Sequence, residues 1–435
     1  MTETTGRPPA GAPVAGRPPH GNGAGRPNPM GAPRPVVKLD VPRFSTAERD
    51  RRWGRVRELM ARENIDVIVA PVNTGQWEHL AANSRYLSSI GGNCSPVATV
   101  FPREGDVTAI TGPVPTKEHW LGYQDWVTDV RPVFFSLSDA VVQRLQELGA
   151  ERWRIGVAGL AGLPRLPEGS VSHGTFLRLE QGFPDAEIVN ATGLLEEARF
   201  VKGDEEIAFL QRSTELVEQS LDVLTREARP GVRECEVYAR MLASQVEAGG
   251  DMPTLILWAS GNPQPMRNYF QPTMRKLEAG DFISTECEAR WGGYCGHITT
   301  QAILGSPPPE YHDMFKVQQE ALNRCRERAR PGALLGEFID IAAEASEGTP
   351  YRCQIIMHGR GLGDDAPMTI FGTQFGGQDE RMKSWRLERN AVLLIKPLVM
   401  TPDWQKWVCW GDPVVVEEGG GRRLSSRTPE IIEIG

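Results

Sequence analysis

The stretch GDFISTECEARWGGYCGHITT, residues 280–300, decides the fold of the chain. Phe282 to Thr285 is typical of a β-strand, and Gly292-Gly293 precedes a return strand through Tyr294 and Ile298. Two β-prone runs on either side of a two-glycine turn predict a β-hairpin.

Three ionisable residues lie in this otherwise apolar hairpin, namely Glu286, Glu288 and His297. Because side chains alternate along a strand, Glu286 and Glu288 point to the same face. Two carboxylates on a buried strand cost free energy unless a positive charge meets them. The hairpin therefore predicts a charged site whose counter-charge comes from elsewhere in the chain.

Length and composition indicate a globular protein of two to three domains. The chain has 435 residues, of which 40% are hydrophobic and 24% charged. The net charge of -8 and the absence of a Lys/Arg cluster argue against nucleic-acid and membrane partners. No apolar run approaches the ~20 residues of a transmembrane helix, and no signal-peptide core is present, so a cytoplasmic location is expected. The seven cysteines form no CxxC pair, which predicts reduced thiols.

The first half of the chain alternates between strand and helix patterns. Residues 1–38 are rich in Pro and Gly and are predicted to be a disordered tail. Ser45 to Glu48 reads as a capping box at the start of a helix. Strands are predicted at 65–70, 97–101, 107–111, 154–158 and 187–190, and helices at 138–148 and 174–181. This order predicts an α/β domain over 45–198. It contains no phosphate-cradling glycine loop, and no cofactor is expected.

A second pattern starts at Arg199. A helix with the acidic start Asp204 to Glu206 ends before Pro230-Gly231. Further helices are predicted at 234–248, 309–329 and 338–345, and strands at 254–259, 353–357, 391–395 and 413–417. Residues 199–435 are therefore predicted to form an α+β domain with helices packed over a curved antiparallel sheet.

Several motifs in order give residues 45–435 a family resemblance. They are Arg199-Phe-Val-Lys202 with Glu205-Glu206-Ile207, Pro272 through Arg275-Lys276-Leu277 to Gly280-Asp281, Gly293-Tyr-Cys295 with Ile298-Thr299, and His358-Gly-Arg-Gly-Leu362. In these motifs the chain resembles the creatinase / aminopeptidase P / prolidase superfamily. The resemblance implies a creatinase-like N-terminal domain, a pita-bread catalytic domain and a homodimer.

The metallopeptidases of this superfamily hold two metal ions with two Asp, one His and two Glu. The resemblance places these ligands at five positions here, in order Glu286, His297, His358, Lys396 and, on or near it, Gly411. A lysine ammonium has no free lone pair and glycine has no side chain, so a two-metal clamp is not expected. Lys396 is instead expected to be the counter-charge of Glu286 and Glu288. Two alternatives stay open: a degenerate site that Lys396 merely neutralises, and a single metal on Glu286, His297 and His358.

Other branches of the superfamily suggest different site residues. The resemblance places the general-base histidine of creatinase at Tyr269, or at Asn268 if the loop shifts by one, so that base is not carried over. Tyr269 is a poor base at neutral pH but could donate a proton or bind substrate. Asp364, six residues after His358, matches the base of the dimethylsulfoniopropionate lyases, or else it caps a loop. Asp365 stands where the peptidases have a second His. Trp291 could offer an aromatic face to a substrate, or fill the core.

The leading function from sequence is a metal-independent, creatinase-like hydrolase of a C–N bond in a small polar substrate. Its expected catalytic residues are His297, His358, Asp364 and Lys396, and its expected substrate-binding residues are Tyr269, Glu286, Glu288, Trp291 and Asp365. The alternatives are a lyase that uses Asp364, a ligand-binding protein without catalysis, and a metallopeptidase that cleaves Xaa-Pro bonds.

Overall fold

The computed structural model describes residues 35–72, 82–92, 95–161, 168–252, 256–265, 271–365, 368–370 and 380–435. The predicted tail, residues 1–38, lies almost wholly outside these ranges, and so does Tyr269. No helix in the described ranges is long and apolar enough to span a membrane. The six cysteines in these ranges form no disulfide with one another, while Cys94 lies outside them.

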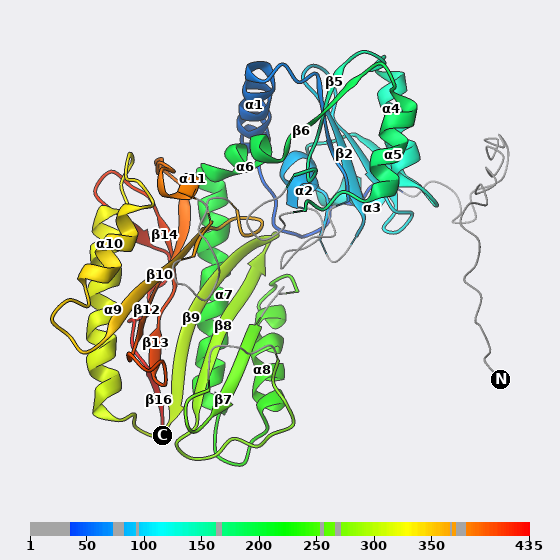
Figure 1. Ribbon diagram of the computed structural model, residues 1–435. Helices are drawn as coiled ribbons and strands as arrows, with labels where there is room; N and C mark the ends of the chain where they lie inside the picture. Colours follow the sequence, from blue (N-terminus) through cyan, green and yellow to red (C-terminus); the bar gives the residue numbers. More distant parts are fainter. Residues whose placement is uncertain are drawn as a thin grey trace, which may run out of the picture. The chain divides into compact units, whose positions relative to one another are not determined.

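The first half of the described chain forms one mixed sheet with helices (Figure 1). Its strands are β1 (Val67–Ala70), β2 (Val97–Pro102), β3 (Thr108–Thr111), β4 (Asp129–Pro132), β5 (Arg154–Val157) and β6 (Glu187–Asn190). Its helices are α1 (Thr46–Arg62), α2 (Ala82–Ser88), α3 (Lys117–Tyr123), α4 (Leu137–Glu147), α5 (His173–Gly182) and α6 (Thr192–Phe200). The strand order is β4-β3-β2-β1-β5-β6. The α/β prediction is confirmed, although β4, α2, α3 and α6 were not predicted.

The second half carries two sheets. Its strands are β7 (Ile256–Gly261), β8 (Phe282–Trp291), β9 (Tyr294–Leu304), β10 (Arg352–Gly359), β11 (Met368–Ile370), β12 (Val392–Met400), β13 (Trp407–Cys409), β14 (Asp412–Val415), β15 (Arg422–Arg423) and β16 (Ile432–Ile434). Its helices are α7 (Asp204–Glu227), α8 (Glu234–Glu247), α9 (Pro309–Arg328), α10 (Glu337–Glu344) and α11 (Glu380–Lys383). Helix α7 packs on β8 and β9, whereas α9 packs on β12 and α10 on β10 (Figure 1).

The two sheets meet at a short backbone bridge. One sheet runs β16-β9-β8-β7 and the other β11-β10-β12-β14-β15, with β13 on β12. The amide of Thr299 donates to the carbonyl of Gly411 at 3.1 Å, and the amide of Gly411 donates back at 3.0 Å. The predicted antiparallel pairing is confirmed for β8 and β9, while β16 adds a parallel strand at the edge. This bridge brings the β8–β9 hairpin next to the segment that joins β13 and β14.

The hairpin turn has the geometry that its two glycines suggest. Gly292 and Gly293 have φ angles of 57° and 87°, which only glycine adopts without strain. A Cβ atom on Gly293 would also lie 2.5 Å from Cζ of Arg85. Both conformational and steric reasons therefore require glycine at this turn.

Replacing Gly293 by Ala should lower the free energy of unfolding by about 2 kcal/mol or more, because left-handed backbone strain adds to the clash. Urea denaturation followed by tryptophan fluorescence measures this loss. Gly54→Ala is the matched control, since Gly54 lies within α1 and a Cβ atom added there would have nothing within 4 Å. That change should instead stabilise the protein by up to about 1 kcal/mol. Equal effects at the two positions would contradict the turn assignment.

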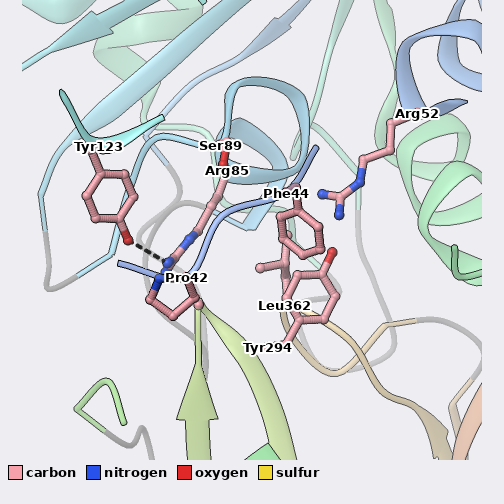
Figure 2. A pocket seen from close by; sticks show the side chains of 9 residues that line it. Pro42, Phe44, Arg52, Arg85, Ser89, Tyr123, Tyr294 and Leu362 are labelled. Atoms are coloured by element: carbon pink, nitrogen blue, oxygen red, sulfur yellow. Dashed lines mark hydrogen bonds between the residues drawn. The ribbon is translucent and has the colours of Figure 1, made fainter. Parts of the chain in front are cut away.

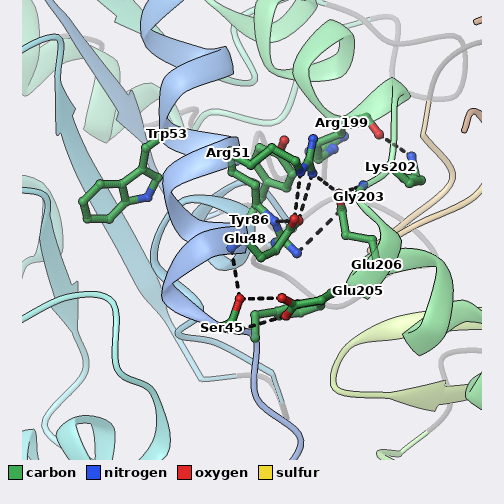
Figure 3. Close-up of polar contacts among 12 residues, drawn as sticks. Ser45, Glu48, Arg51, Trp53, Tyr86, Arg199, Lys202, Gly203, Glu205 and Glu206 are labelled. Carbon is green, nitrogen blue, oxygen red and sulfur yellow. Dashed lines mark hydrogen bonds and ion pairs between the residues drawn. The ribbon is translucent and has the colours of Figure 1, made fainter. Parts of the chain in front are cut away.

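Ser45 is the N-cap of helix α1, but the predicted capping box is only half present. The Ser45 hydroxyl accepts from the amide of Glu48 at 3.1 Å, as expected of an N-cap. The side chain of Glu48, however, binds Arg51 and Arg52 at 2.7 Å each and does not return to Ser45. The amide of Ser45 donates instead to Glu205 of α7 at 2.9 Å (Figure 3). The box prediction was wrong because it considered only local partners.

Candidate active site

The polar face of the hairpin carries the predicted site residues. Register pairs Glu288 with His297 and Glu286 with Thr299, so these four side chains share one face of the β8–β9 pair. Strand β10 contributes His358, and Lys396 lies opposite its neighbour Ile356 on β12. All of these residues are buried. The fold therefore brings together ionisable groups that are up to 110 positions apart in sequence.

Lys396 forms an ion pair with one of the two hairpin carboxylates. Its Nζ atom donates to Oε2 of Glu286 at 3.1 Å. The expectation that Lys396 also neutralises Glu288 was wrong, because the positive charge at Glu288 comes from the guanidinium of Arg360. Arg360 is fully buried, and the sequence-based prediction assigned it no role.

Arg360 joins two histidine–carboxylate pairs into one network. Its guanidinium binds the carboxylates of both Glu288 and Asp364, and it lies 3.2 Å from Nδ1 of His297. Nδ1 of His297 is 3.1 Å from Glu288. Nδ1 of His358 lies 3.1 Å from the carbonyl oxygen of Gly359 and 3.0 Å from Asp364. Glu288 thus orients the ring of His297, and Gly359 and Asp364 together hold the ring of His358.

The Nε2 atom of His297 faces the more accessible end of the network. It lies 3.1 Å from the hydroxyl of Thr299 and 3.4 Å from Oε2 of Glu286. The side chain of Glu286 is 11% exposed, against 3% for Glu288 and His297. A small molecule that reached the cluster would meet Glu286 before Glu288.

The charge of Glu288 is set by its surroundings. Burial alone would raise its pKa, but the guanidinium of Arg360 and the hydrogen bond with His297 outweigh burial and lower the pKa to about 2. Glu288 is therefore a fixed anion at neutral pH. Arg360 and His297 both bind Oε1 of Glu288, so this oxygen orients the imidazole of His297, while the buried Oε2 atom has no hydrogen-bond partner among the described residues.

Acid should remove the stability that the Glu288 ion pair contributes. The pKa of Glu288 is lowered on folding from 4.5 to about 2, so the contribution is complete above about pH 4.5 and is lost as the pH falls toward 2. The difference corresponds to about 3 kcal/mol. We expect Glu288→Gln to destabilise the protein at pH 7 and to flatten the pH dependence of its unfolding free energy between pH 4.5 and 2. A parallel pH profile for the variant and the parent would contradict this assignment.

Two predicted site residues do not join the cluster. Asp365 is held by Lys202 at 2.9 Å and by Arg199 at 3.3 Å, and it is buried. Trp291 lies at the turn end of β8, five residues beyond Glu286 and thus about 16 Å along the strand. Its ring faces the guanidinium of Arg212 at 5.3 Å. Tyr269 lies outside the described residues.

The five positions that the resemblance assigns to metal ligands converge, but their chemistry does not fit two metal ions. Lys396 offers an ammonium group, and the side chain of Lys396 fills the space beside Gly411. A Cβ atom on Gly411 would lie 2.3 Å from Cγ of Lys396, so a ligand side chain cannot enter there as the chain stands. The neighbouring Asp412 does not replace it, because its Oδ2 atom accepts from Trp410 at 2.9 Å. Within the described ranges no three His, Cys, Asp or Glu side chains are arranged to hold a metal.

Sequence reasoning missed Arg360 as a partner of the site. The available signal for Arg360 was its position two residues after His358, directly after the predicted strand 353–357. A buried arginine at the end of such a strand is costly unless it is paired. Nothing in the sequence indicated which carboxylate it would meet.

An α/β domain followed by two facing sheets with outer helices is the pita-bread architecture. Residues 52–201 match the Creatinase/Prolidase N-terminal domain, and residues 208–418 match Metallopeptidase family M24. The chain therefore belongs to the creatinase / aminopeptidase P / prolidase superfamily, whose members named below are hydrolases.

Individual relatives agree with this assignment. The chain is 24% identical over 267 residues to the Xaa-Pro dipeptidase of Pyrococcus furiosus, and the matched region covers 61% of this chain and 74% of that protein. It is 24% identical over 381 residues to the creatinase of a Bacillus species, and this match covers 83% of this chain and 86% of the creatinase. The X-Pro aminopeptidase from Thermotoga maritima superposes with a TM-score of 0.72 at 20% identity, over 88% of this chain and 99% of that one. The last likeness concerns the fold alone.

Proposed function

We propose that this protein is a metal-independent hydrolase of a C–N bond in a small polar substrate. The observation that carries the proposal is the ion pair between Lys396 and Glu286, because the resemblance assigns to Lys396 a position at which the superfamily's peptidases have a carboxylate ligand. Two imidazoles oriented by carboxylates complete the set of groups that acid–base hydrolysis requires.

Each residue has a role that follows from its contacts. His297, oriented through Nδ1 by Glu288, takes a proton from water at Nε2 and can return it to the leaving nitrogen. The water oxygen bonds to the substrate carbon, and the C–N bond breaks as the nitrogen gains that proton. With an amide substrate, Lys396 stabilises the negative charge that develops on the carbonyl oxygen. Glu286 binds a cationic or N–H group of the substrate.

His358 and Asp364 form the second acid–base pair. Asp364 lies against both His358 and Arg360. These contacts support an orienting role for Asp364 more than that of a base that removes a proton from carbon. The lyase alternative is therefore less well supported than hydrolysis.

The neighbourhood of the ion pair favours a substrate with an apolar part. Leu257 pairs with Glu286 across β7 and β8, and Leu398 lies two residues beyond Lys396 on the same face of β12. Both belong to a small apolar cluster, which also contains Ala259, Met400, Trp404, Trp407 and Cys409. A substrate held at Glu286 would meet this cluster next.

Product analysis without added metal tests the proposal. The purified protein should be incubated with chelator and a panel of creatine, other guanidino acids, N-substituted amides and Xaa-Pro dipeptides, and products followed by NMR. We expect hydrolysis of a C–N compound that His297→Ala reduces about 100-fold or more.

Other outcomes would identify the alternatives. Dipeptide cleavage only with added Mn²⁺ would show a metallopeptidase, and an elimination product lost in Asp364→Asn would show a lyase. Tight binding without any product would show a ligand-binding protein. We infer from the resemblance that the protein is a homodimer, which sedimentation of the full chain tests directly.

A further inference from the structure

The segment 358–365, which begins at the end of β10, holds one half of the charged cluster. It carries His358, Arg360 and Asp364, and the carboxylate of Asp364 contacts both other side chains. The position of the His358 ring therefore depends on how the segment itself is fixed. A catalytic group is held accurately only when the residues that support it are packed and bound in turn.

Asp365 fixes the end of this segment through a buried ion pair. Its carboxylate lies 2.9 Å from Nζ of Lys202 and 3.3 Å from the guanidinium of Arg199, and all three residues are buried. Arg199 lies in α6 and also contacts Asn83 of α2, so the ion pair connects the segment to the N-terminal domain. Figure 3 shows Lys202 donating to the backbone of Arg199. A carboxylate buried between two cations is costly to displace.

The segment folds closely over the ion pair at Gly361. A Cβ atom on Gly361 would lie 3.0 Å from Cε of Lys202 and closer still to Oδ2 of Asp365. The carbonyl of Gly361 also accepts from the amide of Cys295 on β9 at 3.0 Å. Because Arg360 directly precedes Gly361, a displacement of the Asp365 carboxylate would reach the guanidinium of the charged cluster.

Leu362 fixes the middle of the segment by apolar contact. It is buried in the same hydrophobic cluster as Phe44 and Tyr294. Figure 2 draws Leu362 beside these two rings, whose centroids are 5.4 Å apart. Phe44 lies just before α1, and the guanidinium of Arg52 in that helix covers its ring at 4.2 Å. Leu362 is therefore a second link between the segment and the N-terminal domain, and this link carries no charge.

We propose that Leu362 and Asp365 are positioning residues, through which the N-terminal domain holds the ring of His358 in place for catalysis. One link is apolar and the other ionic, and both act on the same short segment. This inference rests on the proposed function in one respect, because it assigns the effect to the acid–base step. The expected substrate-binding group Glu286 lies on β8, outside the segment, so the effect should fall on kcat and not on KM.

Turnover of Asp365→Asn and Leu362→Ala on the substrate that the panel identifies tests the proposal. Each variant should lower kcat about tenfold or more and change KM less than about threefold, because a small displacement of a catalytic group slows the reaction without loss of binding. All variants are compared at a temperature at which circular dichroism shows them to be folded. Full kcat in either variant would overturn the proposal.

Two matched variants control for a general loss of stability. Asp281→Asn removes another buried carboxylate, which Arg275 holds at 2.6 Å, and Leu424→Ala empties the same hydrophobic cluster from outside the segment. Both should lower the unfolding midpoint, yet they should keep kcat within about twofold of the parent. If the controls lost as much kcat as the variants of the segment, the role would be merely structural and the proposal wrong.

Imidazole NMR of the full chain gives a readout that does not depend on the reaction catalysed. The chain is labelled with ¹⁵N-histidine, and the His358 signals are identified by their loss in His358→Gln. Asp365→Asn removes a charge and Leu362→Ala removes none, yet both should shift the His358 signals, whereas both controls should leave them in place. If no compound of the panel is hydrolysed, the proposed function fails by itself and these spectra still decide the positioning role. If Asp365→Asn does not fold, Leu362→Ala decides, and unmoved His358 signals in that variant would refute the inference.

Discussion

Replacing Lys396 by Met is expected to reduce kcat about 100-fold or more and to lower the free energy of unfolding by about 3 kcal/mol. The variant keeps most of the side-chain volume but leaves Glu286, which is only 11% exposed, without its ammonium partner at 3.1 Å. Turnover is measured on the substrate that the panel identifies, and stability by urea denaturation.

A second substitution separates the two effects. The double variant Lys396→Met with Glu286→Gln removes both charges, so it should regain most of the lost stability but none of the lost turnover. Lys406→Met is the control, because Lys406 pairs with Glu310 at the surface and is 43% exposed. It should change stability by less than about 1 kcal/mol. Full turnover in Lys396→Met would reject the catalytic role of the lysine.

Replacing Arg360 by Met is expected to have the largest effect on stability, about 3–5 kcal/mol. The guanidinium is fully buried and binds the carboxylates of Glu288 and Asp364 at once. Without Arg360 the pKa of Glu288 should rise, because burial raises this pKa and the guanidinium that lowers it is gone. Unfolding at pH 7 and at pH 4 measures both changes.

The matched substitutions show whether the cost is electrostatic. Adding Glu288→Gln to Arg360→Met should recover part of the stability, since one uncompensated charge disappears. Arg422→Met removes an arginine that is 47% exposed and paired with Glu417, and should cost less than about 1 kcal/mol. If Arg360→Met were no worse than Arg422→Met, the network described around Arg360 would be wrong.

Local patterns predicted most of the secondary structure of the fold. The two-glycine turn and the alternation of Glu286 and Glu288 determine the hairpin, and α7 follows from its acidic start and helical period. Elements without such signals were missed, such as α2 and β4, which are short and depend on the sheet around them.

The sequence predicted which residues form the site but not which charged side chains contact one another. The motif order predicted that four residues would converge, namely Glu286, His297, His358 and Lys396. It did not predict that Lys396 would pair with Glu286 and Arg360 with Glu288, because these ion pairs depend on which side chains reach across the two sheets. The same limit explains the capping error at Ser45, where the partner of its amide is 160 residues away. Long-range partners of charged groups are not encoded in local spacing.

Metal analysis tests the central claim, that a charged network of protein groups takes the place of the metal ions. The protein is dialysed in turn against Mn²⁺, Co²⁺ and Zn²⁺, freed of loosely bound ions, and its metal content is determined by mass spectrometry alongside His358→Ala. We expect no retained metal that depends on His358 and unchanged turnover in the presence of chelator. Two ions per chain that His358→Ala loses, with turnover that chelation abolishes and metal restores, would contradict the account; one such ion would favour the site on Glu286, His297 and His358.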